Sequence, residues 1–177
     1  MSSGGGPRAT GSGLSNEGKF RQRVDDHYRD MAAAKKSIKT AGNLHIASAL
    51  GLGTVTGVMA TLQDDFSAMA TCAVCAVLMV VTGLTARAAS PAAGTKDVEK
   101  HALAYASWVR TLTMLLLLVG SGVATTIHTG AQLPPTPIGE AAAAVGVFDL
   151  IACAIAQVAT AKLLTAFEAQ KAKAKKL

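Results

Sequence analysis

The sequence predicts an all-α membrane protein with four transmembrane helices and both termini in the cytosol. Half of the 177 residues are hydrophobic and only 16% are charged, whereas a soluble domain carries about a quarter charged residues. The hydrophobic residues gather in four long runs, and the basic residues avoid two of the three connections between them. Such a chain has too little polar surface for a soluble globule and too few polar residues for a disordered protein.

The four apolar runs are each long enough to cross a bilayer. A hydrocarbon core of about 30 Å requires about 20 residues of helix. Each run is predicted to be helical because hydrocarbon offers no water to bond the backbone. The third helix is expected to begin before its apolar run, near Asp97. The expected four-helix bundle covers residues 41–167, with spans at about 42–62, 66–86, 107–128 and 141–162.

The placement of charge predicts the orientation of the spans. All 17 Lys and Arg residues lie before the first run, around the second connection, or at and after the end of the fourth run. The first and third connections carry none of them and hold the acids Asp64, Asp65 and Glu140. Because short connections rich in basic residues stay in the cytosol, both termini are expected there, with the acidic connections in the lumen or outside.

Three segments flank the expected bundle. Residues 1–18 are rich in Gly and Ser and are predicted to be flexible. Residues 19–40 form a basic amphipathic stretch, predicted to be a helix beside the membrane. This helix either lies on the anionic headgroups of the cytosolic leaflet or forms a solvated stem continuous with the first span. Residues 168–177 are predicted to be a basic cytosolic tail.

The C-terminal lysines match a retrieval signal. Lys173 and Lys175 are fifth and third from the C-terminus of the sequence, which is the K-x-K-x-x form of the dilysine signal. Two ammonium groups at a fixed distance from a free carboxylate suit an acidic pocket, and the retrograde vesicle coat is the expected partner. A generic basic tail after a last span is the alternative.

Asp149 is the one acid inside a predicted span. A charge at the centre of a spanning helix costs about 2.5–3.5 kcal/mol, and such residues often mark a proton or ion path. No second intramembrane acid or base is expected to complete a relay. We therefore expect Asp149 to be protonated or hydrogen-bonded to Thr125, Thr126 or His128, near the end of the third helix.

Two glycines in the first span predict helix packing. Gly53 and Gly57 form a GxxxG motif, which lets two helix backbones approach closely. Contact with the second span, through the short hairpin between them, is one interpretation. Dimerisation is the other, so the chain is a possible homo-oligomer.

The aromatic residues are expected at the membrane interfaces, where amphipathic rings are favoured. This expectation applies to Phe66, Tyr105, Trp108 and Phe167.

No motif in the chain indicates catalysis, a cofactor or a metal. Cys72 and Cys75 form a CxxC within the second span, but no second pair completes a tetrahedral site, so they are interpreted as buried thiols. His45 is not predicted to be a ligand. No phosphate-binding loop, dinucleotide fingerprint or hydrolase motif occurs. The net charge of +6 gathers at the membrane edges, which favours a bilayer partner and not nucleic acid.

The two ends of the chain resemble the Jagunal family of small four-pass endoplasmic reticulum proteins. The resemblance covers about a fifth of the chain, and the middle departs from the family pattern because Ala, Gly and Thr stand where the family has more aromatics. At the N-terminus it rests on Gly6-Pro7-Arg8-Ala9-Thr10-Gly11-Ser12, Phe20-Arg21-Gln22-Arg23-Val24, His27-Tyr28 and Lys35 to Lys39. At the other end it rests on Gln157-Val158, on Leu163-Leu164 through Phe167, and on the basic tail.

The resemblance implies a non-enzymatic role in the early secretory pathway. Jagunal proteins are associated with endoplasmic reticulum organisation, vesicle-mediated transport and the trafficking of glycoproteins. The residues it carries over are Arg21, Arg23, Tyr28, Lys173 and Lys175. A small scaffold or accessory subunit of a larger membrane complex is the alternative, and transport through the bundle around Asp149 has the least support.

Overall fold

The computed structural model describes residues 16–62, 66–92, 97–128 and 136–174, and this part of the chain is helical without any strand. In chain order the helices are α1 (Asn16–Leu62), α2 (Phe66–Ala92), α3 (Val98–His128) and α4 (Thr136–Ala174). All four are long and apolar enough to cross a membrane. The predicted all-α class with four spanning helices is therefore confirmed.

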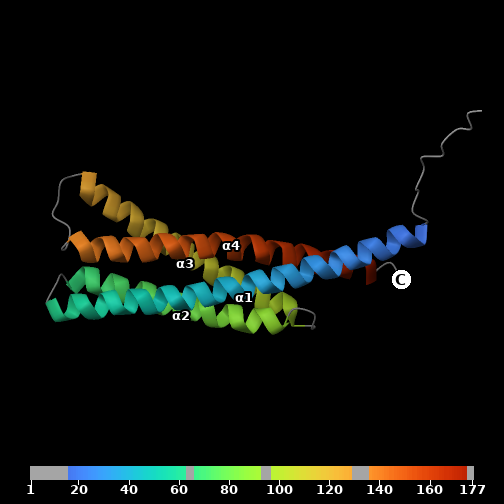
Figure 1. Cartoon of the computed structure of the whole chain (residues 1–177), viewed down its shortest axis with the longest axis horizontal. Coiled ribbons are helices and arrows are strands. Elements are labelled where there is room, and N and C mark those ends of the chain that lie inside the picture. The colour runs from blue at the N-terminus through green and yellow to red at the C-terminus, as the bar shows by residue number, and fades with distance from the viewer. Residues whose placement is uncertain (1–15, 63–65, 93–96, 129–135, 175–177) are drawn as a thin grey trace, which may run out of the picture.

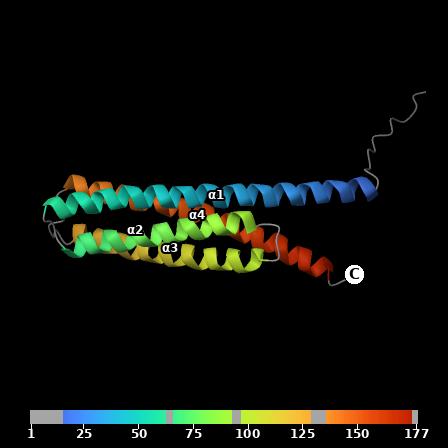
Figure 2. The same ribbon diagram turned by 90° about the horizontal axis from the view of Figure 1, so that it is seen from below.

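The helices run alternately up and down in a bundle (Figure 1). α1 packs against α2 and α4, and α3 packs against the same two helices, so each helix has two main neighbours. α1 begins and α4 ends at the same end of the bundle (Figures 1 and 2). At the opposite end, the last turns of α3 diverge from the other helices (Figure 1).

α1 is much longer than a membrane span. Its 47 residues extend about 70 Å at 1.5 Å per residue, against about 30 Å of hydrocarbon. Residues 19–40 continue the first span without a break. Ala34 and Ile38 are already buried in the core, so only the part of α1 before them projects from the bundle (Figure 2). The described residues thus favour the continuous stem over a separate helix lying on the membrane. α3 begins at Val98, next to the expected Asp97.

Small side chains and two glycines allow α1 and α2 to pack closely. Alanines fill much of the core, so backbones approach each other without large side chains between them. A Cβ on Gly42 would lie 2.6 Å from the Cβ of Ala86. A Cβ on Gly83 would lie 2.6 Å from Cγ1 of Ile46. Either added Cβ would overlap its neighbour, so the close approach of the two helices requires glycine at both positions.

The predicted packing role of Gly53 and Gly57 within the bundle is wrong. Both are exposed on α1, and a Cβ at either position would meet no atom within 4 Å. The dimer interpretation of these two glycines stays a prediction.

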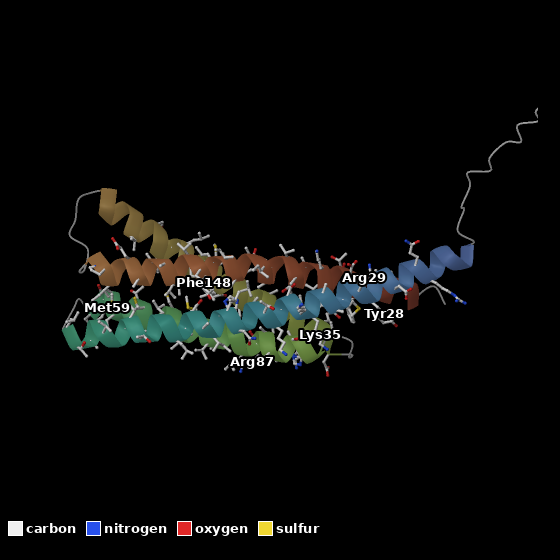
Figure 3. All side chains as sticks on the ribbon, viewed as in Figure 1. Tyr28, Arg29, Lys35, Met59, Arg87 and Phe148 are labelled. Carbon is white, nitrogen blue, oxygen red and sulfur yellow. The ribbon has the colours of Figure 1, made fainter. Side chains whose placement is uncertain are left out.

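The outer surface of the bundle is apolar, as a bilayer requires. Large hydrophobic side chains from all four helices point outward, where lipid tails would contact them. Basic side chains such as Lys35 and Arg87 lie toward the end where α1 begins, whereas Met59 lies toward the other end (Figure 3). The outward apolar residues include Leu50, Val74, Val77, Leu84, Leu103, Met114, Leu117, Leu118, Val147, Ile151 and Val158.

Candidate functional site

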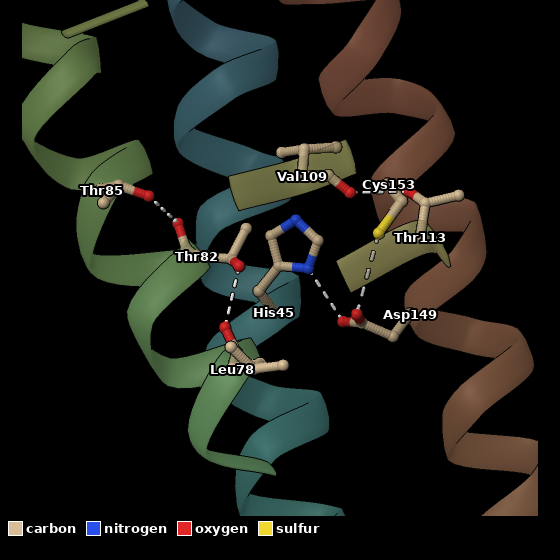
Figure 4. Close-up of polar contacts among 8 residues, drawn as sticks. All are labelled: His45, Leu78, Thr82, Thr85, Val109, Thr113, Asp149 and Cys153. Atoms are coloured by element: carbon tan, nitrogen blue, oxygen red, sulfur yellow. Dashed lines mark hydrogen bonds and ion pairs between the residues drawn. The ribbon is translucent and has the colours of Figure 1, made fainter. Parts of the chain in front are cut away.

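A buried polar cluster lies at the centre of the bundle, where α1 meets α4. Asp149 and Cys153 are four residues apart on α4, so their side chains share one face of that helix. His45 comes from α1, and all three residues are at most 1% exposed. Nδ1 of His45 lies 2.9 Å from Oδ1 of Asp149, and Sγ of Cys153 lies 3.9 Å from Oδ2 (Figure 4). The cluster therefore brings an imidazole, a carboxyl group and a thiol together at the contact between two helices.

The cluster lies within the spanning part of the helices, with His45 about one turn inside the expected start of the first span at residue 42. By the rise of 1.5 Å per residue, His45 is about 26 Å from the end of α1 at Leu62. Asp149 is about 20 Å from the start of α4 at Thr136. Both distances fall within about 30 Å of hydrocarbon. The pair is therefore shielded from water by the bundle and by the membrane.

The hydroxyl groups of Thr82 and Thr113, near His45 and Cys153, donate their hydrogen bonds to other atoms. The ring of His45 lies between Asp149 of α4 and Thr82 of α2, with Thr113 of α3 beside Cys153 (Figure 4). Both threonines donate to carbonyls of their own helices, at 2.8 Å for Thr82 and 2.7 Å for Thr113. Such bonding one turn back is common in membrane helices and leaves the hydroxyl proton unavailable to the ring.

Three buried polar atoms lack a hydrogen-bond partner among the residues that the structure describes. They are Nε2 of His45, Oγ of Ser48 and the hydroxyl of Tyr105. The direction of the bond between Nδ1 and Asp149 depends on the tautomer of the ring, and in either tautomer Nε2 faces no partner among the described residues. An unpaired buried polar group costs about 1–3 kcal/mol. Atoms left unpaired at such cost are typical of functional sites.

Sequence reasoning identified Asp149 but assigned it the wrong partner. Thr113 is the α3 residue beside the cluster (Figure 4), and Thr125 follows it by about 18 Å along the helix. The error came from the start of α4, which lies at Thr136 and not near residue 141, so Asp149 is deeper than expected. The expectation that no second intramembrane acid or base completes a relay stays a prediction, but His45 is an ionisable group in contact with Asp149 that it did not take into account.

The position of His45 had a signal in the sequence. Buried residues on α1 recur at alternating steps of three and four, which is the spacing of a core-facing helix stripe. His45 falls on this stripe, so the spacing could have placed it in the core, although His45 was not predicted there. The stripe consists of Ile38, Ala41, His45, Ser48 and Leu52.

The predicted motif residues lie away from this cluster. Arg21 and Tyr28 are exposed on the projecting part of α1, with Tyr28 68% exposed. Phe20, Arg23 and Val24 lie in the same helix, but their side chains are outside the described part. Lys173 lies in the last turn of α4, again without a described side chain, and Lys175 lies outside the described residues.

The two cysteines of the CxxC motif and Tyr105 also lie where their predictions can be compared with the structure. Cys72 is partly buried and Cys75 is buried on α2, and neither belongs to the cluster. Tyr105 was expected at the membrane interface but is fully buried in the core. Its hydroxyl is one of the unpaired polar atoms, so the ring gains packing contacts at the cost of a hydrogen bond.

Comparison with known proteins gives no relative: no family model, no curated protein and no solved structure matches the chain. The fold and the cluster are therefore described from this chain alone.

Proposed function

We propose that this chain is a non-enzymatic, multi-pass membrane protein of the endoplasmic reticulum. Its role would be to support reticulum organisation and vesicle-mediated protein transport in the early secretory pathway. The observation that supports this most is the common placement of the two motif-bearing ends. α1 begins and α4 ends at the same end of the bundle (Figures 1 and 2), so the N-terminal motif and the tail lysines would face one compartment.

The projecting part of α1 suits contact with anionic headgroups. Lys35, Lys36 and Lys39 are exposed where the helix leaves the bundle. Basic residues close to the cytosolic leaflet each contribute about 1 kcal/mol of attraction to anionic lipids. The stem would therefore be held upright by its own span while its lysines contact the surrounding headgroups.

The retrieval signal gives the sharpest test. In an N-terminally tagged chain, which keeps the C-terminal carboxylate free, K173S/K175S should move the protein from the endoplasmic reticulum to the Golgi or cell surface. The matched control K171S/K176S removes equal charge but keeps the K-x-K-x-x positions, and it should stay in the reticulum. Equal movement of both variants, no movement of either, or mitochondrial fractionation of the unchanged protein would contradict the proposal.

An accessory subunit of a larger membrane complex is the second candidate. It is favoured by the exposed Gly53 and Gly57, which leave a smooth stripe on the outside of the bundle. G53L/G57L would block close approach of another helix there. A larger native complex in mild detergent that G53L/G57L reduces to the size of one chain would support this alternative, and an unchanged size would count against it.

A further inference from the structure

The buried cluster gathers three different metal-ligand groups, an imidazole, a carboxylate and a thiol. Nδ1 of His45, a carboxylate oxygen of Asp149 and Sγ of Cys153 all lie within 4.8 Å of one another. They come from two helices in direct contact, and each residue is at most 1% exposed. Two ligands four residues apart on one helix, with a third from a neighbouring helix, form a recurrent geometry for protein metal sites.

The distances suit a small tetrahedral ion. Zinc lies about 2.0–2.2 Å from nitrogen and oxygen ligands and about 2.3 Å from sulfur, so its ligand atoms stand about 3.3–3.7 Å apart. The two separations in the structure are 2.9 Å from the His45 nitrogen to Oδ1 and 3.9 Å from the Cys153 sulfur to Oδ2, one on either side of this range. A bound ion would therefore require the side chains to shift so that the nitrogen, the sulfur and one carboxylate oxygen face the same point.

The charges also match a divalent cation. A thiolate from Cys153 and a carboxylate from Asp149 together carry two negative charges, and a neutral His45 adds none. A divalent ion bound to them gives a site with no net charge, which a low-dielectric interior tolerates far better than an isolated ion. The thiol proton would be released when the metal binds, since metal ligands must be deprotonated.

The donor set discriminates between metals. Calcium and magnesium take oxygen ligands almost exclusively, whereas imidazole with thiolate selects zinc and its transition-metal neighbours. Three protein ligands leave a fourth position of a tetrahedral ion for water or another small ligand.

We propose that the core of this bundle holds one divalent transition metal, with zinc as the best fit, on His45, Asp149 and Cys153. The ion joins α1 to α4, the two helices that also carry the projecting stem and the basic tail. The metal site does not depend on where in the cell the protein resides. A test of the metal site can therefore fail while the proposed localisation holds, and the reverse.

The test measures metal on the full-length chain in detergent or nanodiscs. After incubation with zinc and removal of free ion, the unchanged protein should retain about one zinc per chain by elemental analysis. H45A and C153S should each lower this retention at least tenfold. The matched control C72S/C75S removes two thiols outside the cluster and should retain the metal. No retained zinc in the unchanged chain, or equal loss in C72S/C75S, would overturn the proposal.

Cobalt gives a readout that does not depend on whether a variant folds. Cobalt(II) bound to a thiolate shows a sulfur-to-metal charge-transfer band in the near ultraviolet, together with visible bands typical of tetrahedral coordination. Both features should appear in the unchanged protein and in C72S/C75S, where Cys153 is the remaining thiol. A spectrum without the charge-transfer band in either protein would exclude coordination by Cys153 and overturn the proposal.

Discussion

The His45–Asp149 pair predicts an unusual pattern of stability changes. In D149L the ring of His45 loses the partner that lies 2.9 Å from Nδ1, and its Nε2 is already unpaired. In H45L the carboxylate of Asp149 keeps only the thiol of Cys153, at 3.9 Å. Leaving a buried polar group without its hydrogen-bond partner costs about 1–3 kcal/mol, and more where the group is charged, as the Asp149 carboxylate is in H45L. Each single variant should therefore lose that amount of unfolding free energy.

The double variant H45L/D149L should be more stable than either single variant. Replacing a whole buried pair with hydrophobic side chains of similar volume is often neutral, or stabilising by about 1–4 kcal/mol. The assay is reversible unfolding of the full chain in mixed micelles, followed by helical circular dichroism and run with a chelator so that a bound metal does not contribute. The four proteins form a double-mutant cycle, which isolates the coupling between the two residues.

T82V is the matched control for this cycle. It also removes a buried polar group beside the ring, but the Thr82 hydroxyl bonds its own helix at Leu78. Its cost should be about 0.5–1.5 kcal/mol, the net value of an ordinary hydrogen bond. Single variants that cost no more than T82V, or a double variant that costs the sum of the two singles, would refute the conclusion that this pair is an energetic link between α1 and α4.

The remaining predictions concern packing, the buried tyrosine and orientation. G42A should destabilise the bundle by about 1–3 kcal/mol in the same unfolding assay, because its Cβ would overlap Ala86, whereas G57A meets open space and should be neutral or stabilising. Y105F deletes a buried hydroxyl without a described partner, so unfolding free energy should stay the same or rise; a loss above about 1 kcal/mol would indicate a hidden partner. Glycosylation acceptor sites inserted in the two acidic connections should be modified in microsomes, and sites at the termini should not; the reverse pattern would invert the proposed orientation.

The helices were predictable because their signals are local. Each apolar run carries its own evidence of length and composition, and the hydrogen bonds of a membrane helix lie within the run itself. The boundaries were less accurate where polar residues extend a helix beyond the bilayer. α1 begins at Asn16 and α4 ends at Ala174, because outside the hydrocarbon the helical backbone continues through residues with good helix propensity, such as Ala, Lys and Glu.

The contacts between helices were not predictable in the same way. The close approach of α1 and α2 depends on Gly42 and Gly83, two single glycines in different helices that form no motif along the chain. The GxxxG motif at Gly53 and Gly57 is visible in the sequence but faces outward. Whether small residues meet depends on the rotation and register of both helices, and neither is encoded in one segment alone.

The polar cluster shows the same limit. Asp149 was recognisable as an intramembrane acid, because a single charged residue stands out in an apolar run. Its partner lies 104 positions away along the chain, and the match depends on the relative height of α1 and α4. Which of its two neighbouring helices α4 turns Asp149 toward depends on the rotation of α4, and the apolar run does not encode that rotation.

The uninterrupted length of α1 has a mechanical consequence. Between residues 19 and 41 the helix contains neither glycine nor proline, the usual places at which a helix kinks. A force on the projecting arm would therefore reach the contact of Gly42 with Ala86 of α2, one turn before His45, without being absorbed by bending before that point.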